Sequence, residues 1–124
     1  MFNNKLVRVK LSEEATGVYK ELCALVKEEK KKGIETSFHQ TLLRSIERVS
    51  DLLKENPFAG YQVPKRQIPA KYFKTYDVDN VWRIELSKFW RLVYTVTGSQ
   101  VEIITFIMDI FSHQDYDKIF GYKR

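Results

Sequence analysis

Three ionisable side chains in the C-terminal half of the sequence suit the chemistry of metal-free RNA cleavage: Glu85, Arg91 and His113. Attack of a ribose 2′-hydroxyl on the adjacent phosphate needs a base for that hydroxyl, a fixed cation for the phosphorane charge and an acid for the leaving 5′-oxygen. Arg91 suits the cation, because a guanidinium stays charged and its planar fork engages two phosphate oxygens. Histidine titrates near neutral pH, so His113 suits proton transfer, and Glu85 is the candidate base. These residues form one possible catalytic trio.

A basic, aromatic segment lies just before them. Between Pro57 and Tyr76 the sequence has four cations and no acid, and two more cations end the chain. Cations interleaved with aromatic rings are typical of RNA-binding surfaces, because they pair with phosphates and stack on bases. We therefore predict RNA contacts by Lys65, Arg66, Lys71, Lys74, Lys123 and Arg124. The alternative is a solvated loop whose lysines only keep the protein in solution.

The composition argues against several other kinds of site. The chain has 124 residues, 44% of them hydrophobic and 30% charged, with a net charge of +5, which fits one globular domain over residues 1–124. A single cysteine, Cys23, excludes an internal disulfide and, with two histidines, gives too few ligands for a structural zinc site. No nucleotide-binding motif is present, so we expect no metal and no cofactor. Without an apolar run of roughly 18 residues or a secretory signal, we expect a cytoplasmic protein that makes no membrane contact.

The N-terminal half predicts a strand followed by a helix hairpin. Alternating apolar and basic residues indicate a strand at Leu6–Leu11. Ser12 is the expected N-cap of a first helix that ends at Gly33, and Ser37 with Gln40 forms a capping box at the start of a second helix. Asn56-Pro57 ends that helix. Each helix has one apolar stripe, so the pair must pack against another layer.

The C-terminal half predicts a meander of three strands. Period-two alternation indicates strands at Val81–Leu86, Trp90–Thr97 and Val101–Met108. Pro57–Asn80 is expected to be an ordered loop with a short strand around Tyr72–Val78, and a short tail helix is expected to begin at Ser112 or His113 and end at Gly121. The fold class is therefore α+β, with an N-terminal strand and a helix hairpin packed on a mainly antiparallel sheet.

The first turn of the meander sets the register. A three-residue loop, Ser87–Phe89, places Trp82 opposite Tyr94 and gathers the apolar side chains on the face toward the helices. It leaves Glu85 opposite Arg91 on the other, exposed face. An exposed cross-strand ion pair of this kind contributes roughly 0.2–1 kcal/mol, so a purely structural pair is the alternative for both residues. For His113 the alternative is a helix cap or a packing residue.

The order of these elements is similar to the RelE/ParE superfamily of toxins. The residues that carry the resemblance are Trp82-Arg83-Ile84-Glu85-Leu86, Trp90-Arg91-Leu92-Val93-Tyr94, Phe106-Ile107, Asn56-Pro57 and the His-x-x-Tyr pair His113 and Tyr116. Two features depart from the RelE-like pattern. Glu85 stands where some members have lysine, and the tail around His113 is acidic where theirs is often basic.

This resemblance implies a toxin paired with a cognate antitoxin, as a homodimer or a toxin–antitoxin hetero-oligomer. RelE-like members cleave mRNA in the ribosome without a metal ion, whereas ParE-like members poison DNA gyrase. The strand arginine that helps to hold the scissile phosphate corresponds to Arg91, and a basic residue on the preceding strand to Arg83. Roles in proton transfer or orientation correspond to His113 and Tyr116. We thus expect an mRNA endonuclease, the alternative being a binding protein that inhibits gyrase or only binds antitoxin or RNA.

Overall fold

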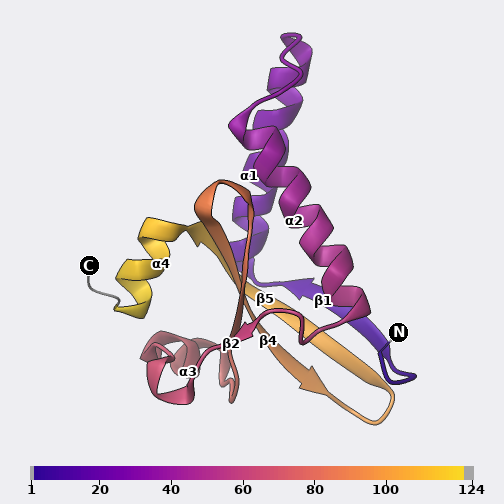
Figure 1. Cartoon of the computed structure of the whole chain (residues 1–124), viewed down its shortest axis with the longest axis vertical. Coiled ribbons are helices and arrows are strands. Elements are labelled where there is room, and N and C mark those ends of the chain that lie inside the picture. The colour runs from indigo at the N-terminus through magenta and orange to yellow at the C-terminus, as the bar shows by residue number, and fades with distance from the viewer. Residues whose placement is uncertain (1, 122–124) are drawn as a thin grey trace.

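The computed structural model describes residues 2–121 and has a five-stranded sheet at its centre, in the order β1-β5-β4-β3-β2 (Figure 1). β1 runs parallel to β5, and the other neighbours are antiparallel. The α+β class and the mainly antiparallel sheet are therefore confirmed. The elements are β1 (Leu6–Leu11), α1 (Glu13–Lys31), α2 (Phe38–Glu55), β2 (Tyr61–Gln62), α3 (Ala70–Tyr76), β3 (Trp82–Glu85), β4 (Trp90–Gly98), β5 (Glu102–Ser112) and α4 (His113–Phe120).

Side-chain caps begin both long helices. The Ser12 hydroxyl accepts a hydrogen bond from the Ala15 N–H at 3.0 Å and donates one to the Met108 carbonyl at 2.6 Å, so the start of α1 is tied to β5. The Ser37 hydroxyl accepts from the Gln40 N–H at 3.1 Å at the start of α2. Only this half of the predicted capping box forms, because the Gln40 side-chain amide donates across the hairpin to Glu29 and to the Ile34 carbonyl.

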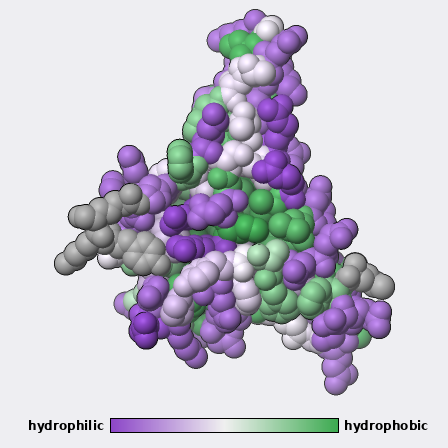
Figure 2. Space-filling model, in the orientation of Figure 1, coloured by the Kyte–Doolittle hydropathy of each residue, from purple (hydrophilic) through white to green (hydrophobic). Residues whose placement is uncertain are grey.

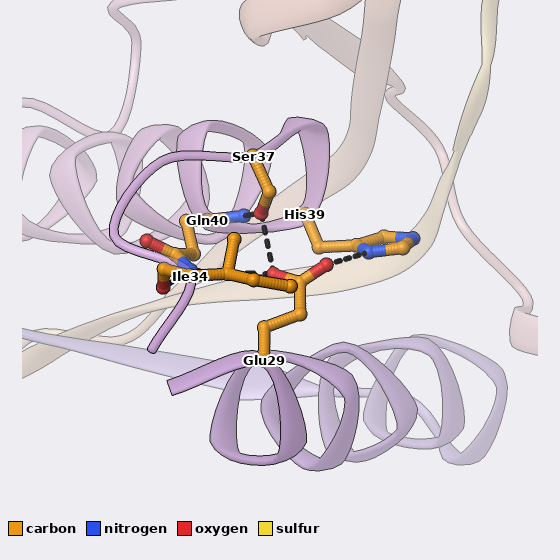
Figure 3. A network of polar contacts seen from close by, with 5 residues as sticks. All are labelled: Glu29, Ile34, Ser37, His39 and Gln40. Atoms are coloured by element: carbon orange, nitrogen blue, oxygen red, sulfur yellow. Dashed lines mark hydrogen bonds and ion pairs between the residues drawn. The ribbon is translucent and has the colours of Figure 1, made fainter. Parts of the chain in front are cut away.

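Glu29 joins the two helices near the turn of the hairpin (Figure 3). Its carboxylate accepts hydrogen bonds from Ser37 and Gln40, and lies 2.8 Å from Nδ1 of His39. His39 is thus a structural residue of the hairpin. Hydrogen bonds from Ser37, His39 and Gln40 lower the pKa of Glu29 below its usual value of about 4.5, outweighing partial burial, which raises it.

The lowered pKa of Glu29 predicts how the stability of the hairpin depends on pH. A carboxyl group whose pKa is lower in the folded state stabilises that state above its unfolded pKa, and this contribution is lost as the pH falls through the folded pKa. Glu29→Gln should therefore unfold at lower urea concentration than the wild type at pH 7, and the difference should shrink from about pH 5 downward. Urea denaturation from pH 7 to pH 3 measures it. A difference that stays constant over this range would contradict the account.

One hydrophobic core lies between the hairpin and the sheet. Apolar side chains gather where the base of the hairpin meets the strands (Figure 2). Tyr94, Leu92 and Leu53 are completely buried there. Trp82 and Trp90 are partly buried against this core, as the sheet register predicts. Its buried members are Ala15, Leu22, Leu42, Ile46, Val49, Leu53, Leu86, Leu92, Tyr94, Ile107 and Ile110.

A second core covers the other face of the sheet, which the sequence predicts to be exposed. That prediction is wrong, because Val93 is 0% and Thr95 3% exposed. The short helices α3 and α4 lie on this side, away from α2 in Figure 1, and close over the strands. The core consists of Val63, Ile68, Tyr72, Val78, Val81, Val93, Met108, Phe111, Tyr116 and Phe120.

Residues 57–80 differ most from the prediction. The expected strand around Tyr72–Val78 is the helix α3, and the two-residue strand β2 and a short 3-10 helix at Lys65–Gln67 precede it. Pro69 lies just before α3, where the missing N–H of proline costs nothing. Asp77 ends the helix in the left-handed conformation, with φ +52°. Tyr72 and Tyr76 are four residues apart, and this spacing places two side chains on one face of a helix as well as on one face of a strand. The spacing therefore does not distinguish the two structures.

The register of the meander is confirmed. Trp82 pairs with Tyr94 and Glu85 with Arg91, and the connecting loop is the predicted three-residue turn, in which Lys88 and Phe89 both have φ +62°. β5 runs to Ser112, four residues past the predicted end of this strand. β5 lies between β1 and β4, and a core covers each face of the sheet there. Both faces of its second half are therefore buried, and the alternation of polar and apolar residues that marks a half-exposed strand is missing.

Gly60 brings the chain against β3 just before β2 begins. A Cβ atom on this residue would lie 2.5 Å from the Arg83 carbonyl oxygen and 2.7 Å from the Tyr94 hydroxyl. The Gly60 N–H donates to that hydroxyl at 3.0 Å. Burial raises the pKa of Tyr94 to about 12, so the hydroxyl stays protonated at neutral pH. The close approach of Gly60 fixes the position of the following residue, Tyr61.

This close approach predicts that Gly60→Ala destabilises the fold. Forcing a methyl group against a carbonyl and a buried hydroxyl typically costs about 1–3 kcal/mol. Gly17→Ala is the matched control, because Gly17 lies inside α1 and a Cβ there would meet nothing within 4 Å. It should stabilise the helix by roughly 0.5–1 kcal/mol. Thermal or urea unfolding measures both variants, and equal effects of the two would contradict this account.

Candidate functional site

Arg91 lies on the sheet face that α4 covers. Its guanidinium carbon lies 4.4 Å from the centre of the Tyr116 ring, a distance at which a cation and a ring attract each other. Its side chain is only 15% exposed, and Nε lies 3.0 Å from a carboxylate oxygen of Glu85. Within residues 2–121, the buried Nε has no hydrogen-bond acceptor in line with its N–H. The contact with Glu85 is therefore an ion pair rather than an aligned hydrogen bond.

Arg83 approaches the same tyrosine from the neighbouring strand. Its Nη1 donates to the Tyr116 hydroxyl at 3.0 Å. Its guanidinium carbon lies 4.5 Å from the Tyr61 ring and 5.4 Å from the Tyr116 ring. Rings therefore flank Arg83, and two guanidinium groups converge on Tyr116.

Tyr116 lies in the helix α4, which holds its ring in place. The Ser112 hydroxyl caps this helix by accepting from the Asp115 N–H at 3.2 Å, and Gly121 ends it with φ +73°. The Tyr116 ring is completely buried and stacks on Phe120, with centroids 4.1 Å apart and planes 11° from parallel. A rigid ring at this position orients both arginines. Its role in proton transfer stays a prediction.

The ion pair between Arg91 and Glu85 lies beside Tyr116 and faces solvent. Glu85 is 63% exposed and contacts Arg91, so solvent screens this pair and its contribution is of the order of 0.2–1 kcal/mol. A phosphate brought to this face would meet guanidinium groups that are already oriented.

His113 lies one turn before Tyr116, in the first turn of α4. Its Nε2 lies 3.4 Å from the Asp117 carboxylate, four residues further along the helix. Its side chain is 27% exposed. This contact fits the structural interpretation of His113, and its proposed part in proton transfer stays a prediction.

Lys71 lies on the same face of the sheet but is already engaged. Its ammonium lies 3.1 Å from the carboxylate of Asp109, which also accepts a hydrogen bond from the Tyr72 hydroxyl at 2.7 Å. Burial and the bond to Asp109 raise the pKa of Tyr72 far above its usual value. Tyr72 and Asp109 are both buried, so these contacts anchor α3 to the strands.

The other predicted RNA contacts are dispersed. Lys65, Arg66 and Lys74 are exposed on the segment that carries α3, and their binding role stays a prediction. Lys123 and Arg124 lie outside the described residues. Within residues 2–121, no three His, Cys, Asp or Glu side chains gather where they would hold a metal ion. Over the same range, no helix is both long and apolar enough to cross a membrane.

The fold is similar to that of a known protein structure. The sequence matches no protein-family model and no curated protein. The structure is similar to that of a YoeB/ParE toxin from Agrobacterium tumefaciens, with a TM-score of 0.52, over 86% of this chain and 98% of that one. The chain has the RelE/ParE-like toxin fold. Because the two sequences are only 16% identical, the similarity establishes the fold alone.

Within this toxin fold, the structure adds Tyr61 to the residues around the arginines. The sequence places Tyr61 in an aromatic, basic segment but does not show which ring faces Arg83. The available signal was Gly60, since a glycine in or next to a strand often marks a close approach of another backbone. The pairing of Tyr61 with Arg83 across β2 and β3 then places both side chains on the same face.

Proposed function

We propose that the protein is the toxin of a toxin–antitoxin pair and cleaves mRNA on the ribosome without a metal ion. The observation that carries this proposal is the convergence of Arg83 and Arg91 on the buried ring of Tyr116. The fold shared with a YoeB/ParE toxin supports the toxin class. Arg91 is the central residue, because it combines a restrained guanidinium with a position beside a solvent-exposed carboxylate.

In the proposed reaction the 2′-oxygen attacks the adjacent phosphorus and the bond from phosphorus to the 5′-oxygen breaks. The products are a 2′,3′-cyclic phosphate and a 5′-hydroxyl. Arg91 and Arg83 stabilise the charge on the phosphorane oxygens. Glu85 takes the proton from the 2′-hydroxyl, and His113 gives one to the leaving 5′-oxygen, with Tyr116 orienting the arginines. Flanking phosphates are held by Lys65, Arg66, Lys74, Lys123 and Arg124, and also by Lys71, whose side chain stays 46% exposed in its pair with Asp109.

The partners follow from the toxin class. A cognate antitoxin protein binds the toxin in the cytoplasm and suppresses its activity, within a toxin–antitoxin hetero-oligomer. A small open reading frame next to the gene should encode it.

Expression in bacteria tests this function. Induction should arrest growth, co-expression of the neighbouring open reading frame should restore it, and mapping of mRNA 5′ ends should show new ends within translated codons. Growth arrest with intact mRNA would contradict cleavage.

The second candidate is a toxin or binding protein that does not cleave RNA. Two observations favour it, namely the pairing of Glu85 with Arg91 and the complete burial of Tyr116, which keeps its ring away from a substrate. A gyrase inhibitor of this fold would block DNA supercoiling and leave mRNA intact. A supercoiling assay with purified gyrase therefore separates the two candidates.

A further inference from the structure

Tyr61 presents an aromatic ring to solvent at the edge of the sheet. It begins β2, the edge strand, and pairs directly with Arg83 of β3. Opposed residues of an antiparallel pair point to the same face, so Tyr61 lies on the side of the arginines. The guanidinium of Arg83 stacks on the ring, yet the residue is still 51% exposed.

The backbone contacts around Tyr61 hold this ring in position. The preceding residue, Gly60, is bonded to the Tyr94 hydroxyl, and the Val63 N–H donates to the Val81 carbonyl at 2.9 Å. Arg83 is itself oriented by its bond to Tyr116. An aromatic side chain that is ordered before binding loses little entropy when a ligand stacks on it.

A hollow of about 280 Å³ lies beside the ring. Its lining residues are Ala59, Gly60, Tyr61, Arg83, Ile84 and Glu85. One of its lining residues, Glu85, pairs with Arg91 on the next strand. Tyr61 and Arg91 are separated by two strand spacings of roughly 4.8 Å and by an offset of two residues, roughly 7 Å along the strands. One or two nucleotides of an extended single strand can bridge this span.

We infer that Tyr61 is a stacking platform for a nucleobase of single-stranded RNA, one that flanks the phosphate held by Arg91 and Arg83. A ring beside a guanidinium suits any base, because every base has a π face, and such platforms occur beside cationic grooves that follow the backbone. The site therefore contributes affinity and positioning with little sequence preference. This inference rests on the proposed function, because it places the base beside the same phosphate.

Binding of uncleavable RNA tests the platform. The probe is a single-stranded 12-mer with 2′-O-methyl riboses, and its Kd is measured by fluorescence anisotropy. A series of otherwise identical 12-mers carries one abasic position moved along the strand. Tyr61→Ala should weaken binding of the intact 12-mer roughly 5- to 100-fold, whereas Tyr61→Phe, which keeps the ring, should stay within about twofold of the wild type.

The abasic series identifies what the ring touches. At one position, loss of the base should weaken wild-type binding by a similar factor, and Tyr61→Ala should then cause no further loss. Phe58→Ala is the matched control, because Phe58 is 42% exposed on the same segment but packs on Trp82 instead of Arg83. It should leave the Kd unchanged.

Three outcomes would overturn the inference. The first is an unchanged Kd in Tyr61→Ala. The second is a loss that is equally large with the abasic probes at every position, which would show a backbone contact. The third is an equally large loss in Phe58→Ala, which would show a general disturbance of the segment instead of a contact with the Tyr61 ring. In all three cases wild-type mRNA cleavage would persist, so the proposed function would stand. A wild type that neither binds nor cleaves RNA would overturn both.

Discussion

Arg91→Ala should abolish growth arrest and reduce mRNA cleavage at least 100-fold. Removing one fixed donor to a transition-state oxyanion typically costs 100- to 1,000-fold in rate, and Arg91 is the proposed main cation at the phosphorane. The measurement is cleavage of a translated mRNA by purified protein, followed by primer extension. The variant should stay folded, because the lost contacts are an ion pair with the exposed Glu85 and a ring contact worth roughly 0.5–1 kcal/mol.

Arg8→Ala is the matched control for this variant. Arg8 also forms an ion pair across strands, with Nε 2.9 Å from a Glu102 carboxylate oxygen, but it lies on β1, away from the cluster at Tyr116. Its loss should change neither growth arrest nor cleavage. Full toxicity in Arg91→Ala would show that the proposed site is wrong, whereas equal loss in both variants would indicate a general charge effect.

Tyr116→Ala should lower the free energy of unfolding by about 3–5 kcal/mol, the usual cost of removing a buried aromatic ring. The ring stacks on Phe120, contacts Phe111 edge-on and supports both arginines. Tyr116→Phe keeps this packing and removes only the hydroxyl that accepts from Arg83, so it should cost about 1 kcal/mol. Urea denaturation at pH 7 measures both.

Tyr61, which is half exposed, is the control for the effect of Tyr116→Ala on the free energy of unfolding. Tyr61→Ala removes a ring of the same kind from the sheet edge and should cost far less than Tyr116→Ala. If Tyr116→Ala were as stable as the wild type, the ring would not support the second core. A large loss of mRNA cleavage in Tyr116→Phe, at nearly wild-type stability, would show that the orientation of Arg83 matters to the reaction.

The register of the strands was predictable because the first two strands of the meander each have large apolar residues on the face toward the helices and mostly polar residues on the other face. Trp82, Ile84 and Leu86 lie opposite the apolar residues Trp90, Leu92 and Tyr94 only if the turn has three residues. The structure has that turn. The caps at Ser12 and Ser37 were predictable for a similar reason, since each needs only a local hydrogen bond. Local patterns of this kind require no knowledge of distant contacts.

The second core was not predictable from such patterns. Val93 and Thr95 alternate with the first core's residues as solvent-facing residues would, and helices far away in the sequence cover them. Tyr116 meets Arg83, 33 residues earlier in the chain, through a contact that no periodicity reveals. The sequence therefore identified the arginines and the tyrosine separately, and the structure shows that they form one cluster.

Cleavage of a defined mRNA on ribosomes kept assembled by Mg²⁺ is the decisive test, because the end groups of the products show whether the 2′-hydroxyl attacks. Purified protein is added to ribosomes stalled on a short mRNA, before and after replacement of the ribose at the cleaved position by 2′-deoxyribose. We predict cleavage of the all-ribose mRNA to a 2′,3′-cyclic phosphate and a 5′-hydroxyl, with no cleavage after the replacement. Cleavage that persists at the 2′-deoxy position would contradict the account, as would an RNA left intact under both conditions.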